Sequence, residues 1–490
     1  MEKQIYNPFL PINVYIPDGE PHVFGNRVYL YGSHDKEGGD RFCMLDYEVW
    51  SAPISDLSDW TCEGTSYKKI QDPHSINGKP VDYYAPDCVK GNDGKYYLYY
   101  VAMGPNTKNF GPMAVAVSDK PEGPFEYLGD IKYKDGKPVL KYLTNDPAVI
   151  NDNGRIYLYY GWGLGHDFRN KALAPLYNFV QSKLFNRSVK EIKRTKPSIL
   201  SCAVVELEND MLTVKDEPRA VLDSKTSADK KSEFYNHAFY EAPSIRKFND
   251  TYYLIYSLGQ NNELCYATSK YPDKDFVYRG VIISNSDIGY KGNTKRLVAG
   301  GTIHGSIEEI NGQYYVFYHR CTNNTDYSRQ ACAERITVLS DGSIPQVEIT
   351  TQGLNGQPLK GTGTFPAIMC CNLFNSKTRN VQGNGYGKSQ PNITCANNER
   401  YIRAIADGTT VGYKYFRFED VKRLKITVRG SAGRIIVGTT VNHKFVEIPV
   451  TGALEWKTYS VDFVLPNGIY PLYFTYKGKG KIDFLAFEIF

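Results

Sequence analysis

Residues 85–100 read APDCVKGNDGKYYLYY, and this pattern returns four more times in the first two-thirds of the chain. The other copies are EPHVFGNRVYLYGS (20–33), DPAVINDNGRIYLYY (146–160), APSIRKFNDTYYLIYS (242–257) and SIEEINGQYYVFYH (306–319). Each copy consists of an apolar strand, a turn with Gly, Asn or Asp, and a second strand rich in Tyr, which is typical of a β-hairpin. Five such hairpins at intervals of roughly 60–95 residues predict five radial sheets, and therefore a five-bladed β-propeller.

Composition is that of a soluble globular protein with many aromatic residues. The chain has 490 residues, of which 41% are hydrophobic, 23% charged and 14% aromatic, with 40 Tyr. This length allows a large core and more than one domain. Tyr favours β-strands and also offers a flat face to sugars. Acidic and basic residues are mixed along the chain, whose net charge is +5, so we expect no nucleic-acid partner.

The N-terminal residues and the cysteines indicate the cellular compartment in which we expect the protein. Residues 1–21, MEKQIYNPFLPINVYIPDGEP, contain no apolar run of the length of a signal peptide. No segment of the chain approaches transmembrane length, so no membrane partner is expected. The 10 Cys form no CxxC pair, which fits a reducing environment. If Met1 is the native start, these features predict a cytoplasmic protein.

The repeat ends near residue 347, where the composition changes. We therefore predict a propeller domain over residues 1–347. The segment TTQGLNGQPLKGTGTF (350–365) is rich in Gly, Thr and Gln, which predicts a linker over residues 348–367. Short strands with closely spaced turns follow, which predicts a β-sandwich over residues 368–490 and an all-β chain overall. One helix is expected at 172–185, within an insertion that reaches over one face of the propeller.

Carboxylates lie at or just before the start of four hairpins. These residues are Asp18, Asp87, Asp146 and Glu241, and His304 precedes the fifth hairpin. The innermost strands of a propeller face one axis, so we expect equivalent positions to converge there in an acidic ring suited to sugar hydrolysis. Asp18 and Asp146 would separately also fit turns in which Asp bonds its own backbone. Glu241 stands in the apolar context FYEAP (239–243), which raises a carboxyl pKa and suits a proton donor.

The segments around these carboxylates resemble glycoside hydrolase family 43, and the resemblance covers residues 7–345. PDGEPHVFGNRVYLYGSHD (17–35) is similar to the segment with the general base, which falls on Asp18, with Glu20 as the alternative register. NDPAVI (145–150) resembles the segment whose Asp raises the pKa of the acid, here Asp146. YEAPSI (240–245) resembles the general-acid segment, here Glu241. The resemblance implies single-step inversion of the glycosidic bond.

The same resemblance implies a set of substrate-binding residues. They are Asp87 in YYAPDCVK, His304 in GGTIHGS and Arg329 in YSRQACAER, with Arg335 as the rival of Arg329. Trp162 is the best candidate for an aromatic wall, ahead of Trp50 and Trp60. His304 is also implied to contact, through water, a structural Ca²⁺ at the propeller axis. Hydrolysis by this route requires no cofactor.

The predicted substrates are arabinose- or xylose-containing oligosaccharides. Because His34-Asp35 resembles the arabinofuranosidase branch, we expect an exo-acting α-L-arabinofuranosidase that removes arabinofuranosyl residues from arabinoxylan-type oligosaccharides. The alternatives are a β-D-xylosidase or bifunctional enzyme, an endo-arabinanase, a retaining fructosidase propeller and a non-catalytic sugar-binding propeller. The C-terminal segment resembles a family 6 carbohydrate-binding module, in which Tyr413, Tyr415 and Trp456 are either sugar contacts or core residues. We expect this domain to be mainly structural.

Overall fold

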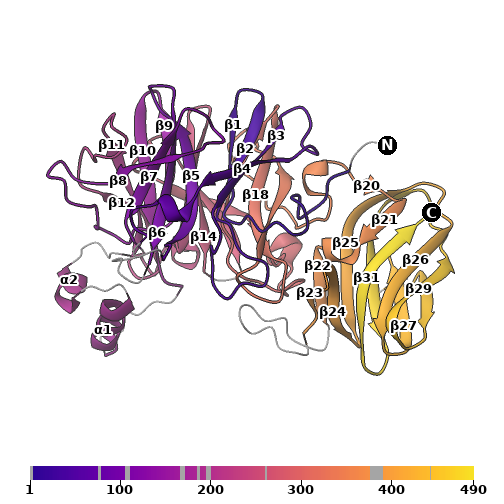
Figure 1. Ribbon diagram of the computed structural model, residues 1–490. Coiled ribbons are helices and arrows are strands. Elements are labelled where there is room, and N and C mark those ends of the chain that lie inside the picture. The colour runs from indigo at the N-terminus through magenta and orange to yellow at the C-terminus, as the bar shows by residue number, and fades with distance from the viewer. Residues whose placement is uncertain are drawn as a thin grey trace.

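The chain folds into two neighbouring β-domains, a propeller at the left of Figure 1 and a sandwich at the right. The computed structural model describes residues 4–75, 79–104, 111–165, 172–184, 188–194, 200–259, 262–375, 390–441 and 443–490. The predicted all-β class, with a five-bladed propeller followed by a sandwich, is confirmed.

Each of the first four blades is an antiparallel sheet of four strands in the described part of the chain. Blade 1 contains β1 (Glu20–Phe24), β2 (Arg27–Tyr31), β3 (Tyr47–Pro53) and β4 (Thr61–Tyr67). Blade 2 contains β5 (Asp82–Lys90), β6 (Tyr96–Met103), β7 (Met113–Ser118) and β8 (Glu126–Asp130). Blade 3 contains β9 (Ala148–Asp152), β10 (Arg155–Gly161), β11 (Ser201–Leu207) and β12 (Arg219–Asp223). Blade 4 contains β13 (Glu241–Phe248), β14 (Thr251–Leu258), β15 (Glu263–Ser269) and β16 (Val277–Ser284).

Blade 5 is completed by the N-terminal segment of the chain. Its strands are β17 (Gly305–Ile310), β18 (Gln313–Cys321) and β19 (Arg329–Ile336). The Phe9 N–H donates to the Ala331 carbonyl at 3.2 Å, and the buried Asn7 exchanges hydrogen bonds with both backbone groups of Ala333. These bonds cover the outer edge of β19, so the beginning of the chain closes the ring on its last blade.

The Tyr-rich second strands form the layers between blades. Residues of β6 are buried almost throughout, so the strand is a continuous run of large side chains without polar alternation. Their hydroxyl groups donate to carbonyls of neighbouring loops, as Tyr31 does to Pro121 at 2.6 Å and Tyr160 to Lys141 at 2.9 Å. Most of the Tyr excess is therefore explained by packing between blades.

The sandwich consists of two sheets in the described residues. One contains β20 (Leu359–Lys360), β22 (Asn372–Asn375), β25 (Thr409–Phe418), β27 (Gly433–Gly438), β28 (Val446–Val450) and β30 (Gly468–Lys477). The other contains β21 (Gly363–Pro366), β23 (Asn392–Ala396), β24 (Glu399–Ala406), β26 (Arg423–Gly430), β29 (Ala453–Asp462) and β31 (Lys481–Ile489).

The predicted linker differs from what the structure has. Residues 348–367 include β20, which pairs with β25, and β21, which pairs with β31. Leu359 and Phe365 are buried in the core that both domains share. The Gly-rich composition suggested a free linker, but these two apolar side chains anchor the segment in the sandwich.

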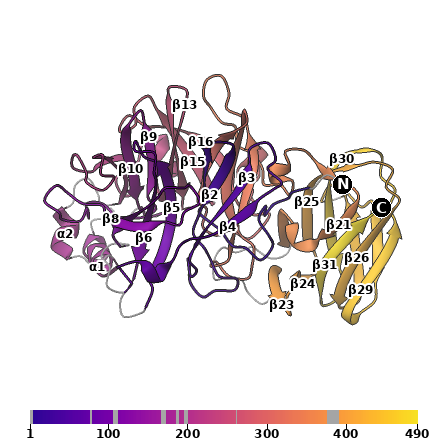
Figure 2. The same cartoon turned by 45° about the horizontal axis from the view of Figure 1, so that its top comes forward.

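The two domains have a packed interface, which both views of the ribbon show (Figure 2). A single apolar cluster runs from Ile255 and Val316 in the propeller to Tyr413 in the sandwich. The buried Lys414 ammonium lies 3.1 Å from Asp287 and 2.9 Å from Glu348. Such a partly charged, partly apolar interface gives the sandwich a fixed place beside the propeller.

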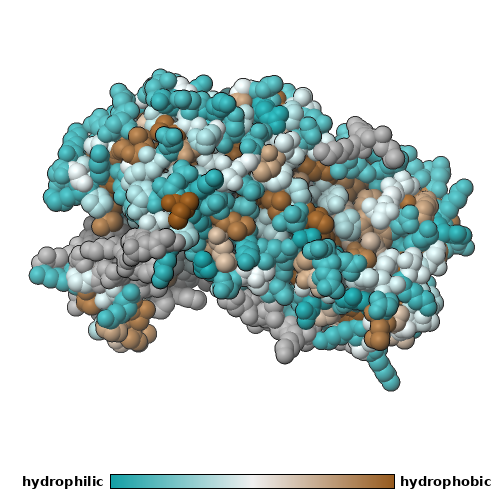
Figure 3. All heavy atoms as spheres, in the orientation of Figure 1, coloured by the Kyte–Doolittle hydropathy of each residue, from teal (hydrophilic) through white to brown (hydrophobic). Residues whose placement is uncertain are grey.

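Helical structure is minor. The insertion between β10 and β11 of blade 3 forms α1 (Ala174–Leu184) and α2 (Val189–Arg194), which agrees with the helix expected at 172–185, although residue 185 lies outside the described residues. Short 3-10 turns are η1 (Lys69–Gln71), η2 (Glu233–His237), η3 (Tyr290–Gly292), η4 (Gly353–Asn355) and η5 (Ala367–Met369). Leu176, Phe179 and Val180 of α1 are exposed, as the brown atoms at the lower left of Figure 3 show. No described helix is long and apolar enough to cross a membrane.

Candidate active site at the propeller axis

A bend in the backbone marks the same position in four blades, just before the innermost strand in blades 1 and 3 and within its first residues in blades 2 and 4. The φ angle is positive at Asp18 (59°), Ala85 (34°), Asp146 (47°) and Ala242 (61°), and Pro or Gly follows each of them. Left-handed backbone is uncommon for such residues, so its recurrence identifies equivalent positions. The hairpin registers place His304 of blade 5 at the same position. We call these five residues the site row.

The residues two positions later form a second layer, which we call the buried row. Its members are Glu20, Asp87, Ala148, Ser244 and Ser306. The predicted ring of equivalent carboxylates is therefore wrong in detail. Asp18 and Asp146 do share a register, but Glu241 precedes the site row by one residue and Asp87 belongs to the buried row. The sequence pattern could not separate these positions because the bulges that offset them appear only when the strands pair.

Asp18 lies beside one arginine and two histidines. Its Oδ1 lies 2.8 Å from Arg329 Nη1, 3.2 Å from His319 Nδ1 and 3.8 Å from His304 Nδ1. Burial alone would raise the pKa of this carboxyl, but Arg329 and the two histidines outweigh burial and hold the pKa of Asp18 well below its usual range. Asp18 is therefore ionised at neutral pH, which is the state that can accept a proton.

Asp146 and Glu241 form a second electrostatic unit. The Ala242 N–H donates to Asp146 Oδ2 at 3.0 Å, which brings this carboxylate next to Glu241. Burial and then the charge of Asp146 raise the pKa of Glu241 to about 8. Burial also raises the pKa of Asp146, to about 6, although His304 opposes this shift. At neutral pH Glu241 therefore keeps its proton beside an ionised Asp146.

Trp162 contacts the protonated member of this pair. Its Nε1–H donates to Glu241 Oε2 at 3.0 Å, and its ring centroid lies 5.8 Å from that of Tyr240. The predicted position of Trp162 beside the active centre agrees with this contact. Trp50 and Trp60 are packed in a separate apolar cluster between blades 1 and 5, where Trp60 lies against Phe9. They therefore do not contribute to this site.

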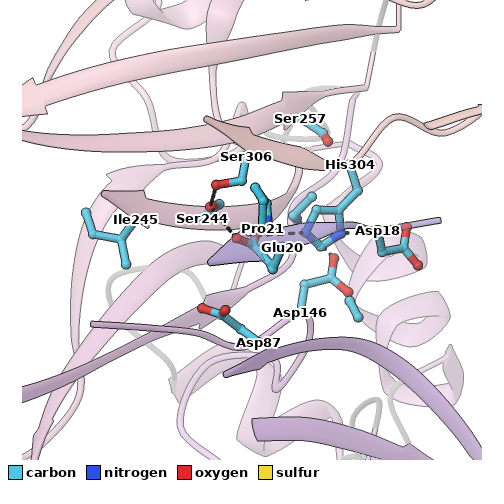
Figure 4. A network of polar contacts seen from close by, with 12 residues as sticks. Asp18, Glu20, Pro21, Asp87, Asp146, Ser244, Ile245, Ser257, His304 and Ser306 are labelled. Carbon is cyan, nitrogen blue, oxygen red and sulfur yellow. Dashed lines mark hydrogen bonds and ion pairs between the residues drawn. The ribbon is translucent and has the colours of Figure 1, made fainter. Parts of the chain in front are cut away.

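The buried row holds Glu20 away from the site row. Glu20 is 2% exposed, and its Oε2 accepts hydrogen bonds from Ser244 Oγ and Arg246 Nη2, both at 2.9 Å. Figure 4 shows Glu20 beside Ser244 and Ser306, with Asp18 on the other side of His304. Asp18 is thus the carboxylate of blade 1 that shares the register of Asp146, while Glu20 lies one layer deeper in an ion pair.

Asp87 does not reach the site, contrary to the prediction that it binds substrate. It is fully buried, and its Oδ1 lies 2.6 Å from His22 Nε2 and 2.8 Å from the Cys88 N–H. Its Oδ2 accepts from the Val149 N–H at 2.7 Å. Because Asp87 sits two residues past the bend, its carboxylate points into the propeller and ties blade 2 to blades 1 and 3.

Arg329, rather than its rival Arg335, enters the site. Arg329 is 5% exposed and binds two carboxylates, Asp18 through Nη1 and Asp35 through Nε and Nη2. Arg335 is exposed and lies at the other end of β19. That Arg329 reaches the sugar stays a prediction, and in the structure its guanidinium binds two protein carboxylates.

Sequence reasoning missed His319 as a site residue, and it missed the contact of Asp35 with Arg329. His319 is fully buried, with Nδ1 near Asp18 and Nε2 3.0 Å from the Thr302 hydroxyl. Asp35 binds Arg329, as described above. A signal existed for His319, because it ends the last copy of the hairpin repeat, in the second strand of blade 5. Asp35 was noted with His34 only for substrate preference, and its place in a loop after β2 gave no signal for its contact with Arg329.

A cation at the axis has a suitable donor set beneath His304. The nitrogens of His304 lie 3.8 Å from Asp18 Oδ1 and from Glu20 Oε1. Burial lowers its basicity, yet the carboxylates of Glu20, Asp146 and Asp18 raise the pKa of His304 to about 9, so the ring is protonated and is a poor direct ligand. Glu20, His22 and Asp87 offer ligand atoms within 4.8 Å of one another. Glu20 Oε1 is buried without a hydrogen-bond partner among the described residues, so carboxylate oxygens fit a hard cation here.

Comparison with known proteins agrees with this geometry. Residues 5–344 match the family described as glycosyl hydrolases family 43. A xylosidase/arabinosidase of Thermoclostridium stercorarium is 42% identical, over 100% of this chain and 99% of its own length. A β-xylosidase of Xylanibacter ruminicola is 29% identical over 68% of this chain and 97% of its own.

Solved structures extend the comparison. The RS223 β-xylosidase superposes with a TM-score of 0.51 and 28% identity, covering 71% of this chain and 99% of that one. A GH43_1 enzyme of Xanthomonas citri complexed with xylose gives a TM-score of 0.52 and 26% identity, covering 72% and 96%. Both matches support the propeller fold. From the whole-length relative and the matched family domain, the chain belongs to glycosyl hydrolases family 43 and is an inverting glycoside hydrolase.

Proposed function

We propose that this enzyme removes terminal α-L-arabinofuranosyl and β-D-xylosyl residues from xylan-derived oligosaccharides. The observation that carries the proposal is the 42% identity over the whole chain to an enzyme named for both activities. The electrostatics of the site support it, because an ionised carboxylate and a protonated one share the propeller axis. The pair has the protonation states that an inverting glycosidase requires.

The proposed reaction is a single displacement. Glu241 gives its proton to the glycosidic oxygen as the bond to the sugar breaks. Asp18 takes a proton from a water molecule that attacks the anomeric carbon from the opposite face. Asp146 stays ionised beside Glu241 and keeps the pKa of the acid high through like-charge repulsion. Trp162 fixes the orientation of the Glu241 carboxyl through its indole N–H.

The sequence argument favours arabinofuranosides as the better substrates. It relied on His34-Asp35, and the structure uses both residues in the loop that supports Arg329: His34 binds the Asp46 carbonyl and Asp35 binds the guanidinium. β-D-Xylosidase activity is the second candidate, because the Xylanibacter ruminicola relative is named a β-xylosidase. Endo-arabinanase action and sugar binding without hydrolysis are the remaining alternatives.

The reaction as proposed needs no cofactor, because protein side chains supply both acid and base. A calcium ion at the axis would be held by Glu20 and Asp87, with His304 in contact through water. When bound, such an ion would supply positive charge near the site row. The Arg246 guanidinium already neutralises one oxygen of Glu20, so the propeller does not depend on the ion for charge balance there.

The test is a side-by-side rate assay on p-nitrophenyl α-L-arabinofuranoside and p-nitrophenyl β-D-xyloside. We expect hydrolysis of both, with the arabinofuranoside faster. The anomer released from xylobiose, followed by NMR, should be inverted, and a retained anomer would contradict the mechanism. Release of internal fragments from debranched arabinan without either monosaccharide would replace the proposal by an endo-arabinanase. Binding without hydrolysis would leave a sugar-binding propeller.

A further inference from the structure

A second group of metal-binding side chains lies away from the axis, between blades 3 and 4. It consists of His237 at the end of η2, together with Glu263 and Cys265 on β15, and their ligand atoms all lie within 4.8 Å of one another. Glu263 and Cys265 are two residues apart in a strand, so they point to the same face of the sheet. Tyr256, the cross-strand partner of Cys265, donates to the His237 carbonyl at 2.7 Å and holds η2 over that face.

The three side chains are built into the fold. Cys265 is fully buried and Glu263 is 6% exposed, while His237 is half-buried. The His237 ring stacks on Tyr278, with centroids 4.4 Å apart and an interplanar angle of 14°. Its Nδ1 is buried and has no hydrogen-bond partner among the described residues. A buried imidazole nitrogen normally has a partner, so the fixed ring indicates a ligand at this point.

We propose that His237, Glu263 and Cys265 bind a divalent metal ion of the zinc class. The donors are one imidazole nitrogen, one carboxylate oxygen and one thiolate sulfur, which a borderline-soft ion such as Zn²⁺ accepts together and a hard ion such as Ca²⁺ does not. On binding, the Cys265 thiol releases its proton to solvent, and the charges of thiolate and carboxylate then balance the two charges of the metal. Water completes the coordination from the exposed side of His237.

The proposed ion would connect two parts of blade 4 that are separate in sequence. β15 is the third strand of the blade, and η2 belongs to the connection from β12 of blade 3 to β13. β13 begins at Glu241, four residues after His237. The ion would therefore anchor the connection that leads into the proposed general acid. Its role would be structural, and it does not depend on which sugar the enzyme prefers.

The test uses Co²⁺ as a coloured substitute for Zn²⁺ on the full-length protein after dialysis against a chelator. We expect one equivalent to bind with a thiolate-to-cobalt charge-transfer band, and Zn²⁺ to displace it. His237→Ala should weaken the affinity for Co²⁺ at least about tenfold, because loss even of a residue that only supports a metal ligand typically lowers metal affinity by about 10–100-fold. Cys265→Ala should remove the band. Cys62→Ala and His443→Ala, which change exposed residues elsewhere, are the matched controls.

The proposal fails if Co²⁺ gives no thiolate band, or if the band persists in Cys265→Ala. It also fails if His237→Ala binds Co²⁺ as tightly as the unchanged protein, since His237 is half-buried and can be replaced without opening the core. If Cys265→Ala does not fold, Glu263→Gln takes its place, because it preserves the shape of the side chain and removes the charge of one proposed ligand. It should then weaken Co²⁺ binding, and unchanged affinity would contradict the proposal. The experiment measures an absorption spectrum of bound Co²⁺. Its result therefore does not depend on whether the enzyme hydrolyses arabinofuranosides or xylosides.

Discussion

Arg329 Nη1 lies 2.8 Å from Asp18 Oδ1, so a buried ion pair links blade 5 to the proposed base in blade 1. The other edge of the guanidinium binds Asp35, with Nε 2.8 Å from Oδ2 and Nη2 3.0 Å from Oδ1. The Phe42 ring lies 4.6 Å from its central carbon. Three neighbours therefore fix the arginine, and the arginine in turn fixes the charge and the direction of Asp18.

Asp35→Asn should impair catalysis although Asp35 does not contact the substrate in the proposed mechanism. Without the carboxylate, Arg329 loses its paired hydrogen bonds and shifts relative to Asp18. We expect kcat to fall about 10–100-fold, which is the scale for a small misplacement of a reacting group, with a smaller change in KM. Steady-state kinetics check this, with the exposed turn variant Asp341→Asn as control. A change confined to KM would contradict the positioning role.

Glu241→Gln and Asp18→Asn should each lower kcat by about 10²–10⁴-fold on xylobiose, the range for general acid–base groups. They should differ with leaving group, because a p-nitrophenolate leaves without a proton. We therefore expect Glu241→Gln to recover much of its activity on p-nitrophenyl substrates, while Asp18→Asn stays inactive on them.

Glu20→Gln tests the register of the base. Glu20 is in an ion pair with Arg246 on the buried row, so its substitution should mainly lower the thermal stability. Unchanged turnover in Asp18→Asn together with complete loss in Glu20→Gln would move the base to Glu20.

Asp146→Asn should shift the alkaline limb of the pH profile. The negative charge of Asp146 raises the pKa of Glu241, so its removal should lower that pKa. The wild-type kcat/KM should fall as pH rises through about 8, because Glu241 then loses its proton. In Asp146→Asn the fall should begin at a lower pH. An unchanged alkaline limb in this variant would show that Asp146 does not set the pKa of the acid.

Trp162→Phe should shift the same limb in the opposite direction. The indole N–H stabilises the charged form of Glu241 and so lowers its pKa, which means that its loss should raise the pKa. We also expect kcat to drop about 10–100-fold, since one hydrogen bond to a charged group contributes about 1.5–3 kcal/mol. The pH dependence of kcat and of kcat/KM on xylobiose, whose leaving group needs a proton, measures both effects. A limb that moves to lower pH would contradict this assignment.

Arg400→Met tests whether the sandwich domain stabilises the active-site loop that contains Asp35 and Glu37. Arg400 binds Glu37 through Nε at 2.8 Å and Nη2 at 2.6 Å, and Glu37 also accepts from the Tyr15 hydroxyl at 3.0 Å. Loss of this pair should cost about 1–3 kcal/mol of unfolding free energy and lower kcat/KM, because Glu37 is two residues from Asp35. Arg434→Met, which removes a looser surface contact to Glu447, should change neither. Equal effects of the two substitutions on stability and kcat/KM would show that the Arg400–Glu37 pair has no special influence on the active-site loop.

The fold class could be predicted because a repeat of hairpins leaves few ways to bury its strands. Alternating turns and Tyr-rich strands specify local pairing, and five similar units specify radial packing. The linker at 348–367 was predicted less well. Its Gly and Gln content suggested an unstructured linker. Leu359 and Phe365 instead pack in an apolar core that residues of both domains form together. The burial of single apolar residues such as these cannot be predicted from the neighbouring sequence alone.

The sequence by itself determined the hairpins, the two domains and the identity of Asp18, Asp146 and Glu241 as candidates, because these depend on local pattern and turn chemistry. Tertiary structure alone decided which carboxylates face the axis. A bulge of one residue in each of β5 and β13 turned Asp87 into the propeller and left Glu241 beside Asp146. It also decided their charge states, since the pKa of Asp18 and that of Glu241 move apart only when burial, Arg329 and Asp146 come together across five blades. Electrostatic interactions depend on distance in space, which the order of residues does not specify.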